Sequence, residues 1–334
     1  MSSMRDEGPF VVEWVAHHLV VGFDRILIAS NDCSDGTDLL LRALADRGYV
    51  SHLNQTVRPG ALPQHDAYSK LRATFSVDAE EWLLVLDADE FLNVHCGNHT
   101  LDALISKADP NVDIIALNAA TFGANGPSKW RPAPVTSQFL LRHPTHDWRS
   151  APVKSLTRRP AHFAAIHNHS MINYRGPKTF VRCMRADGTC FDLDLTVPFW
   201  KQLRNFPDKD CSHDFAQYNH YAVKTWDTFL ARRDRGRGAA PMDRANDRHS
   251  REYFDLRASG SVEDRTILRY SPAIKQKITE MLSDDRISAC HERCVRRYRK
   301  RMRGYWMMPE AHQAEGDNVA DENVGPTRGE APQT

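Results

Sequence analysis

Apolar residues in the first part of the chain alternate between a helical and a strand-like spacing. Four stretches in which they return every three or four residues are interleaved with four short, nearly continuous apolar runs. The predicted helices are residues 9–21, 38–48, 67–77 and 101–108, and the predicted strands are residues 23–30, 49–54, 81–89 and 112–118. This alternation favours a sheet of mostly parallel strands with helices on both faces, and therefore an α/β fold.

Beyond residue 120 the alternation is less regular. Short apolar runs and longer stretches of helical spacing still occur, separated by segments rich in proline, glycine and polar residues. The predicted strands here are residues 136–142, 152–158 and 162–167, and the predicted helices are residues 215–234 and 263–283.

The balance of charge changes near the end of the chain. Residues 286–304 carry eight basic residues and one acidic residue, whereas residues 309–334 carry six acidic residues, one basic residue and few apolar ones. A segment of the second kind buries too little apolar surface to fold, so we predict that it is disordered. We therefore divide the chain into an α/β domain (1–240), a helical C-terminal extension (241–308) and a disordered acidic tail (309–334).

The basic segment 286–304 is a predicted helix without a clean apolar face. A helix of this charge is attracted to anionic lipid, which predicts a peripheral contact with the inner face of a membrane. A solvated helix is the alternative. Nucleic-acid binding has only the charge in its favour, so no nucleic-acid partner is predicted.

Composition narrows the class of protein. The 334 residues are 41% hydrophobic and 26% charged, which is typical of a globular protein, and a net charge of +1 excludes a general polyanion binder. Seven cysteines form no dense framework, which favours reduced thiols and a cytoplasmic location. No stretch approaches the roughly 18 apolar residues of a membrane span, and the N-terminus has no secretory apolar region.

The apolar run 81–89 ends in acid, within the sequence LVLDADEF. In an open α/β sheet, ligands bind beyond the carboxyl ends of the strands. Asp87 and Asp89 are two residues apart, so on a strand both carboxylates face the same side. Such a pair repels unless a cation lies between the two groups, and Mg²⁺ or Mn²⁺ prefers oxygen ligands. A solvated strand end with an aspartate helix cap is the alternative.

A second polar cluster follows the predicted strand 23–30. Asn31, Asp32 and Asp35 stand in a tight turn, and the sheet would bring them to the same edge as Asp87. Asp35 or Thr37 can cap the next helix by accepting its first N–H groups. The alternative is that a carboxylate of this turn binds a nucleobase or ribose hydroxyls.

Several ordered motifs resemble a known family. The opening RDEGPFVVEWVAHHLVVGFDRILIASNDCSDGT is followed by LDADEF, by TFGANG (121–126), and by Asn-His-Tyr (219–221) with Lys224 and RRDRGRG after it. In this order and spacing they resemble family 2-type glycosyltransferases of the GT-A fold, over roughly residues 4–240. The GT-A fold implies a Rossmann-like, mostly parallel central sheet flanked by helices.

The chain departs from the family pattern in three places. Asp6 stands where the family usually has Asn, and the strand that normally precedes Arg5 is mostly absent. Residues Ala120 and Thr121 stand where the family has a Trp before Phe122. The first two departures concern the nucleotide pocket, and the third concerns the acceptor side.

The resemblance implies roles for individual residues. It places the nucleotide near Arg5, Glu7, Asp32, Asp35 and Asp87. It makes Asp89 a direct ligand of Mn²⁺ or Mg²⁺, with Asp87 beside the metal and His220 completing the site from the C-terminal side. A neutral imidazole suits a cation such as Mn²⁺, although packing on a helix is the ordinary role of a His-Tyr pair.

Cationic residues near His220 in the sequence are candidates for binding the diphosphate of the donor. Lys224 and Arg235 can contact phosphate oxygens, and a solvated helix face is the alternative. On the acceptor side, an inverting transfer needs a base, for which we choose Asp147. The rival carboxylates are Asp192, Asp194 and Asp214. The His167–His169 segment offers acceptor or metal contacts, or polar groups of a strand.

The sequence therefore predicts a metal-dependent, inverting glycosyltransferase. It would move a hexosyl group from a nucleotide-diphosphate sugar, with a UDP-sugar as the expected donor, to a glycan or lipid-linked acceptor. A nucleotidyltransferase of GT-A-like fold is one alternative, although RDEGPF lacks the Gly-rich basic phosphate loop that it needs. A non-catalytic nucleotide-sugar-binding protein is the other.

Overall fold

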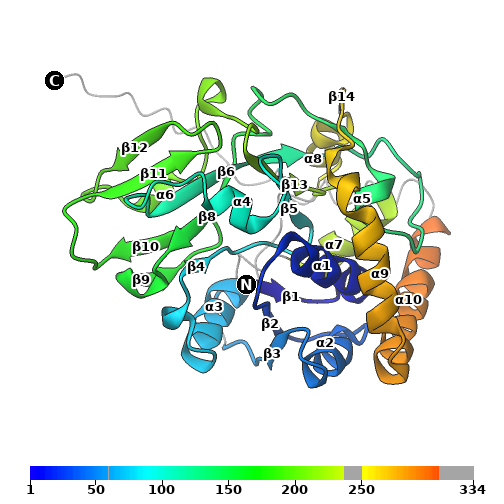
Figure 1. The fold of residues 1–334 in the computed structure, drawn as a ribbon. Helices are drawn as coiled ribbons and strands as arrows, with labels where there is room; N and C mark the ends of the chain where they lie inside the picture. Colours follow the sequence, from blue (N-terminus) through cyan, green and yellow to red (C-terminus); the bar gives the residue numbers. More distant parts are fainter. Residues whose placement is uncertain (59, 237–249, 308–334) are drawn as a thin grey trace, which may run out of the picture.

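Helices and strands alternate through the N-terminal part of the chain, as Figure 1 shows for the computed structural model. The structure describes residues 1–58, 60–236 and 250–307, so the predicted acidic tail 309–334 lies outside the described residues. The described strands are β1 (Ser2–Met4), β2 (Leu27–Ser30), β3 (Ser51–Asn54), β4 (Trp82–Leu83), β5 (Glu90–Val94), β6 (Ile114–Thr121), β7 (Leu141–Arg142), β8 (Val153–Arg158), β9 (Phe163–Ile166), β10 (Met171–Tyr174), β11 (Val181–Arg185), β12 (Cys190–Leu193), β13 (Ala216–His220) and β14 (Val262–Glu263). The described α-helices are α1 (Gly8–Val21), α2 (Thr37–Asp46), α3 (Pro63–Thr74), α4 (Leu101–Ile105), α5 (Val135–Gln138), α6 (Phe199–Gln202), α7 (Trp226–Arg235), α8 (Arg251–Ala258), α9 (Ser271–Leu282) and α10 (Asp285–Trp306).

The first three strands form a small parallel sheet in the order β1-β2-β3. Met4 pairs with Ser30, and Ser30 pairs with Asn54, so the three strands end at one edge. The opening strand, which the sequence suggested was mostly absent, is present as three residues paired with β2. Helix α1 begins with Pro9 in its first turn and ends at Gly22 in the left-handed conformation, as predicted.

The larger sheet is mixed, which corrects the prediction of a mostly parallel sheet. Strand β6 pairs in parallel with β11 and β13, whereas the pairs β4–β8, β6–β8, β5–β13 and β11–β12 are antiparallel. Consecutive strands such as β11 and β12 are joined by a short turn, and a parallel pair would need a crossover of a dozen or more residues. The α/β class is confirmed, and the mixed sheet is compatible with a GT-A fold.

Three local predictions need correction. The run 81–89 is strand only at β4, and a new strand, β5, starts at Glu90, so Asp87 and Asp89 lie in a turn between two strands. The predicted strand 136–142 begins as the short helix α5 because the buried carboxylate of Glu13 accepts hydrogen bonds from its first N–H groups. The predicted helix 215–234 is strand β13 followed by helix α7.

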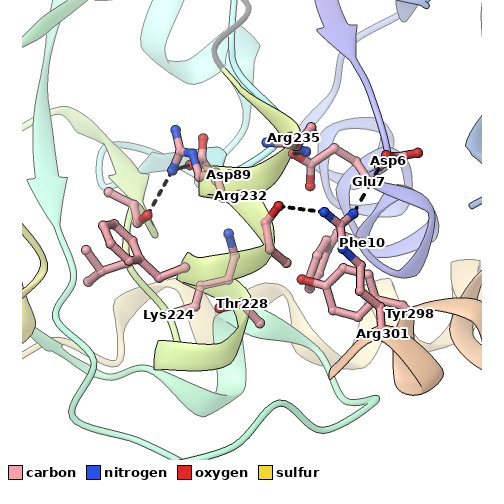
Figure 2. A pocket seen from close by; sticks show the side chains of 14 residues that line it. Asp6, Glu7, Phe10, Asp89, Lys224, Thr228, Arg232, Arg235, Tyr298 and Arg301 are labelled. Atoms are coloured by element: carbon pink, nitrogen blue, oxygen red, sulfur yellow. Dashed lines mark hydrogen bonds and ion pairs between the residues drawn. The ribbon is translucent and has the colours of Figure 1, made fainter. Parts of the chain in front are cut away.

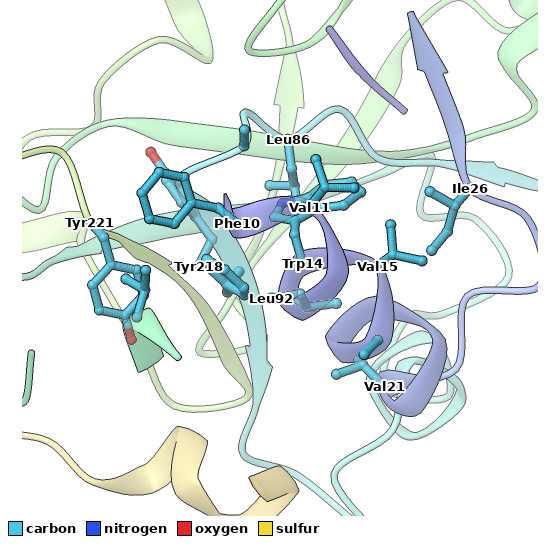
Figure 3. Close-up of a cluster of buried hydrophobic side chains, with 14 of the residues drawn as sticks. Phe10, Val11, Trp14, Val15, Val21, Ile26, Leu86, Leu92, Tyr218 and Tyr221 are labelled. Atoms are coloured by element: carbon cyan, nitrogen blue, oxygen red, sulfur yellow. The ribbon is translucent and has the colours of Figure 1, made fainter. Parts of the chain in front are cut away.

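The C-terminal helices share the core of the α/β part. Helices α9 and α10 lie side by side and contact α1, and α10 also contacts α2 (Figure 1). The core around α1 contains Phe10, Trp14 and Val15, together with strand residues such as Leu92 (Figure 3). Helix α10 adds the buried stripe Ile287, Cys294, Tyr298, Met302 and Tyr305. This helix therefore has an apolar face, which the sequence analysis missed, and that face is used inside the protein.

Acid should destabilise the fold through buried histidines such as His17 on α1. Its Nε2 is 2.7 Å from the carbonyl oxygen of Leu92, and burial lowers its pKa to about 4. The unfolded chain, with a histidine pKa near 6.5, then binds the proton more readily, so stability is lost as the pH falls from about 6.5 to about 4. The loss from this one group is about 3 kcal/mol.

Urea unfolding at a series of pH values between 4 and 7 measures this effect. In His17→Leu the slope of unfolding free energy against pH should fall by up to about 1.4 kcal/mol per pH unit, the value for one proton. An unchanged slope in this variant would show that His17 does not titrate in this window.

Candidate active site

A cavity of about 550 Å³ opens where β1, β2 and β13 end. Its lining comes from two parts of the chain. The N-terminal part contributes Ser3, Met4, Arg5, Glu7, Asn31, Pro63, Gln64, Asp87, Ala88, Asp89 and Glu90. The later part contributes Thr121, Trp148, Arg149, Pro152, Asn168, His169, Arg204, Asn205, Tyr218, His220, Phe229, Arg232, Arg235, Gly236, Tyr253 and Arg257. The cavity has the size of a ligand site, and most of its charged groups are brought together only by the fold.

The acidic turn before β5 is held in place by helix α1. The indole N–H of Trp14 donates to the carbonyl oxygens of Asp87, at 3.2 Å, and Glu90, at 2.9 Å. The turn is closed by the Glu90 N–H, which donates to the Asp87 carbonyl oxygen at 3.0 Å, and by the Glu90 carboxylate, which accepts from the Asp87 N–H at 2.8 Å. Trp14 therefore orients the acidic segment.

Asp87 and Glu90 share a buried lysine. Lys154 on β8 is 1% exposed, and its Nζ is 2.8 Å from Glu90 Oε2 and 3.2 Å from Asp87 Oδ2. The other oxygen of Asp87 accepts a 2.7 Å hydrogen bond from Gln64 on α3. Burial would lower the pKa of Lys154, but the two carboxylates outweigh it and raise that pKa above its usual range. Lys154 is therefore a fixed positive charge beneath the acidic turn.

Asp89 faces a different cation. Its Oδ2 accepts a 2.7 Å hydrogen bond from Arg232 on α7, whose guanidinium also donates to the carbonyl oxygen of Ala222 (Figure 2). Burial would raise the pKa of Asp89, but Arg232 and neighbouring cations hold it far below its usual range. His220 lies beside this pair because β13 runs antiparallel to β5, with His220 opposite Glu90. Burial lowers the pKa of His220 to about 4, so its imidazole is neutral at pH 7.

The predicted metal ligands fit a divalent cation in part. Asp89 Oδ2 and His220 Nε2 are 3.8 Å apart, close enough to share one ion. The carboxylate of Asp87 is held by Lys154 and Gln64 instead. Within residues 1–58, 60–236 and 250–307, no three His, Cys, Asp or Glu side chains gather as a metal site would require. A cation here would thus take most of its ligands from substrate and water.

Further cations lie where α7 meets the end of β1. Arg235 forms an ion pair with Glu7 and donates to the carbonyl oxygen of Arg5, and Arg5 donates back to the carbonyl oxygen of Arg235 at 3.3 Å. Lys224 lines a smaller adjoining pocket rather than the main cavity, and in Figure 2 its ammonium points towards Asp89 and Arg232. These contacts bring the predicted phosphate-binding residues Arg235 and Lys224 close enough to Asp89 to act on its charge.

The aspartates after β2 do not line the cavity, although Asn31 does. Asp35 is buried, accepts hydrogen bonds from Thr37 at the start of α2, and accepts another from the N–H of Gly8. Asp6 in turn accepts from the N–H groups of Ser34 and Asp35. The two loops are thus tied together, and Asp35 has the capping role that the sequence left open. Asp32 is exposed and accepts a hydrogen bond from Asn31.

The predicted base also lies outside the cavity lining. The carboxylate of Asp147 accepts hydrogen bonds from Nε and Nη2, on one edge of the Arg149 guanidinium, at 2.7 and 2.6 Å. Hydrogen bonds from Arg149 lower the pKa of Asp147, which makes it a weaker proton acceptor. Among its rivals, Asp192 pairs with Arg182 and Asp194 caps a turn at Thr196, and none of the rivals lines the cavity.

Sequence reasoning missed two groups of this site. Lys154 was not considered, although a single lysine within the apolar strand sequence VKSLT was a signal of a buried cation. Glu90 was quoted with the aspartates but given no role. The Phe122-Gly123 motif has a packing role, since Phe122 stacks on Tyr221 with ring centroids 4.9 Å apart. A Cβ atom on Gly123 would lie 2.3 Å from the carbonyl oxygen of Ala258.

Comparison with known proteins finds two similar plant proteins. Over 127 residues the chain is 28% identical to a glycosyltransferase family 92 protein of Ricinus communis, which covers 37% of this chain and 22% of that protein. Over 169 residues it is 25% identical to a glycosyltransferase family 92 protein of Oryza sativa subsp. japonica, which covers 49% of this chain and 28% of that protein. The matched region thus spans about a quarter of the length of these curated relatives. No family profile matches the chain.

These matches confirm a resemblance to glycosyltransferases. They do not support the family 2 assignment, since both relatives carry the name of family 92. Among the described residues, no helix is both long enough and apolar enough to pass through a lipid bilayer.

Proposed function

We propose that the protein is a glycosyltransferase that takes a hexosyl group from a nucleotide-diphosphate sugar. The observation that carries the proposal is the cavity in which Asp87, Asp89 and His220 face Arg5, Arg232 and Arg235. Similarity to proteins named glycosyltransferases supports it independently. We propose further that the fold is GT-A and that the chemistry is of the inverting, family 2 type, which the motif order supports.

In this proposal the chain's own residues orient the donor. Asp87, fixed by Lys154 and Gln64, accepts a hydrogen bond from a ribose or sugar hydroxyl. Arg5 offers the nucleotide a donor, because its Nε is buried and has no hydrogen-bond partner in the described part of the chain. Arg235 and Lys224 contact the diphosphate, whose negative charge compensates these cations. The predicted contacts of Asp32 and Asp35 with base and ribose stay a prediction.

Asp89 and His220 are the residues that would hold Mn²⁺ or Mg²⁺. Such an ion would supply charge stabilisation to the diphosphate as it leaves. Arg232 must move from Asp89 for this to happen, and the arriving diphosphate offers that guanidinium a new partner. The proposal thus includes an exchange of partners at Asp89 when donor and metal bind together.

Isothermal titration with UDP tests the proposal. We expect UDP to bind at least about tenfold more tightly in the presence of Mn²⁺, a difference of about 1.4 kcal/mol, because the metal and Asp89 share the diphosphate. The Asp89→Ala variant should lose this metal effect while remaining folded. Binding that is unaffected by metal would contradict metal dependence, and absence of any nucleotide binding would contradict the function itself.

The acceptor and the cell compartment belong to the same proposal. We propose a glycan or lipid-linked acceptor and a cytoplasmic location, with the exposed basic side of α10 in peripheral contact with anionic lipid. That side carries Arg293, Arg296, Arg299, Lys300 and Arg303. Because the apolar stripe of α10 is buried in the core, such a contact would be electrostatic and would weaken as salt is raised.

A further inference from the structure

We propose that His169 is the catalytic base, and that its Nε2 atom takes the proton from the attacking acceptor hydroxyl. The inference rests on the glycosyltransferase function proposed above and deepens it, since it assigns the acceptor side of the same cavity. It also replaces the carboxylate expected in this role with an imidazole.

The hydrogen bonding of His169 fixes the tautomer of its ring. The residue lies in the turn between β9 and β10, and its Nδ1 is 2.8 Å from the carbonyl oxygen of Val153. A carbonyl oxygen only accepts hydrogen bonds, so Nδ1 must carry the proton, and Nε2 of the neutral ring is then an acceptor. Nε2 has no hydrogen-bond partner among the residues that the structure describes, and His169 lines the cavity. The ring therefore offers a free lone pair to a bound ligand.

Val153 also connects His169 to the acidic turn. It precedes Lys154 on β8, and Lys154 binds the carboxylate of Asp87. Strand β8 thus holds the imidazole of His169 through the carbonyl oxygen of Val153, and it holds the acidic turn through the side chain of Lys154. His169 and Asp87 are close enough to interact electrostatically. The base would therefore lie beside the place where the donor binds.

The other proton acceptors of the cavity are engaged. Each carboxylate that lines it has a cationic partner. These pairs are Asp87 and Glu90 with Lys154, Asp89 with Arg232, and Glu7 with Arg235. His220 is the other imidazole of the lining, and it lies 3.8 Å from Asp89, where it would help to hold a cation. His169 is the group left in the described lining with an unshared basic atom.

The charge state of His169 is right for a base. Burial, with the nearby charge of Lys154, lowers its pKa to about 3, so the ring is unprotonated at neutral pH. A base of such low pKa is weak in the free enzyme. The negative diphosphate of a bound donor opposes the effect of Lys154 and raises the pKa of the imidazole towards the working range.

The cavity lining also contains Asn168 and Trp148, which we call the acceptor wall. The Oδ1 atom of Asn168 is buried and has no hydrogen-bond partner in the described chain, so it is an acceptor for a second hydroxyl. Trp148 lines the cavity and is 49% exposed, and an aromatic side chain can contact a sugar. The guanidinium groups of Arg257 and Arg149 lie over its ring, 4.8 and 5.4 Å from the centroid. The ligand class that fits this wall is a hydroxyl-rich acceptor such as a sugar ring.

The step balances without a further reactant. The acceptor oxygen bonds to the anomeric carbon as the bond from that carbon to the β-phosphate oxygen breaks. The electrons of the broken bond leave with the nucleoside diphosphate. The hydroxyl proton passes to Nε2 of His169 and later to solvent. Water in place of the acceptor gives the same step as donor hydrolysis, which needs no known acceptor to be measured.

The test is donor hydrolysis by the full chain, measured as UDP released from UDP-glucose, UDP-galactose and UDP-N-acetylglucosamine. In His169→Asn the amide N–H takes the place of Nδ1–H and keeps the bond to Val153, while the basic Nε2 is lost. For the fastest donor, we expect kcat to fall by about 10²- to 10⁴-fold, with the affinity for UDP unchanged. A merely structural histidine would tolerate asparagine.

The matched control is His146→Asn, because the Nδ1 atom of His146 also lies 2.8 Å from a carbonyl oxygen, that of Asp208, and His146 does not line the cavity. It should hydrolyse the donor at nearly the wild-type rate. In His169→Gly, added imidazole should restore part of the activity, which restored folding alone would not explain. An active wild type with an equally active His169→Asn overturns the assignment of the base, whereas a wild type that binds no UDP and hydrolyses no donor overturns the proposed function.

Discussion

Replacing Asp89 by asparagine should lower donor turnover by at least about a thousandfold. The amide keeps the shape of the side chain but removes the charge that faces Arg232 at 2.7 Å. In the proposed mechanism, the variant would have no carboxylate to share a cation with His220, so the ion that would stabilise the leaving diphosphate would no longer be held. Release of UDP in the presence of Mn²⁺ measures the effect, and a loss of less than about tenfold would contradict the role of Asp89.

Loss of stability must be separated from loss of function in this experiment. Removing one partner of a buried ion pair commonly costs about 3–5 kcal/mol in the free energy of unfolding. Asp264→Asn is a matched control, because Asp264 is also buried and pairs with Arg142 at 3.0 Å, but does not line the cavity. Both variants should lose stability, and only Asp89→Asn should lose turnover per folded molecule.

Replacing Lys154 by methionine should lower the free energy of unfolding by about 3–5 kcal/mol. The methionine fills the space of the lysine stem but leaves Glu90, which is 3% exposed, and Asp87 without their cation. Burial already raises the pKa of Glu90 to about 8 beside Lys154, and loss of the ammonium would raise it further, so protonation of Glu90 limits the loss. Urea unfolding at pH 7 gives the value, and a loss below about 1 kcal/mol would show that the ammonium is not needed to hold the acidic turn.

The double variant Lys154→Met/Glu90→Gln separates the contribution of Glu90 from that of Asp87. If the unpaired carboxylate causes the loss, the neutral glutamine should recover at least half of it, because the buried negative charge is removed together with the positive one. If the double variant is as unstable as Lys154→Met, the charge of Glu90 is not the cause of the loss, which leaves Asp87 as the carboxylate on which Lys154 acts.

The elements nearest the N-terminus were the most predictable from the sequence. Pro9 and Gly22 mark the two ends of α1 because proline suits the first turn of a helix and glycine tolerates the left-handed conformation after the last. The later elements were less predictable. Residues 135–138 form a helix rather than a strand because Glu13, distant in the sequence, accepts its first N–H groups. The spacing of apolar residues along the chain does not indicate a hydrogen-bond partner so distant in the sequence.

The residues of the candidate site were likewise only partly predictable from the sequence. LVLDADEF identified Asp87 and Asp89, and the motif order identified His220 and Arg235, all of which line the cavity. The proposed base was not predictable, because the sequence does not show that the carboxylate of Asp147 pairs with Arg149. His169 was considered only as an ordinary strand residue or a contact. Its distinguishing feature is a hydrogen bond to Val153, which sequence spacing does not reveal.

The sequence by itself determined the alternating N-terminal elements, the acidic pair Asp87 and Asp89, and the set of residue types that a glycosyltransferase would need. Only the tertiary structure decided the mixed orientation of the larger sheet, the partners of each carboxylate and the placement of Lys154 beneath Asp87 and Glu90. The physical reason is how far apart in the sequence the interacting residues are. Periodicity and helix ends reflect interactions between residues a few positions apart, whereas the partner of a buried charge is set by which distant strand the fold brings within about 3 Å.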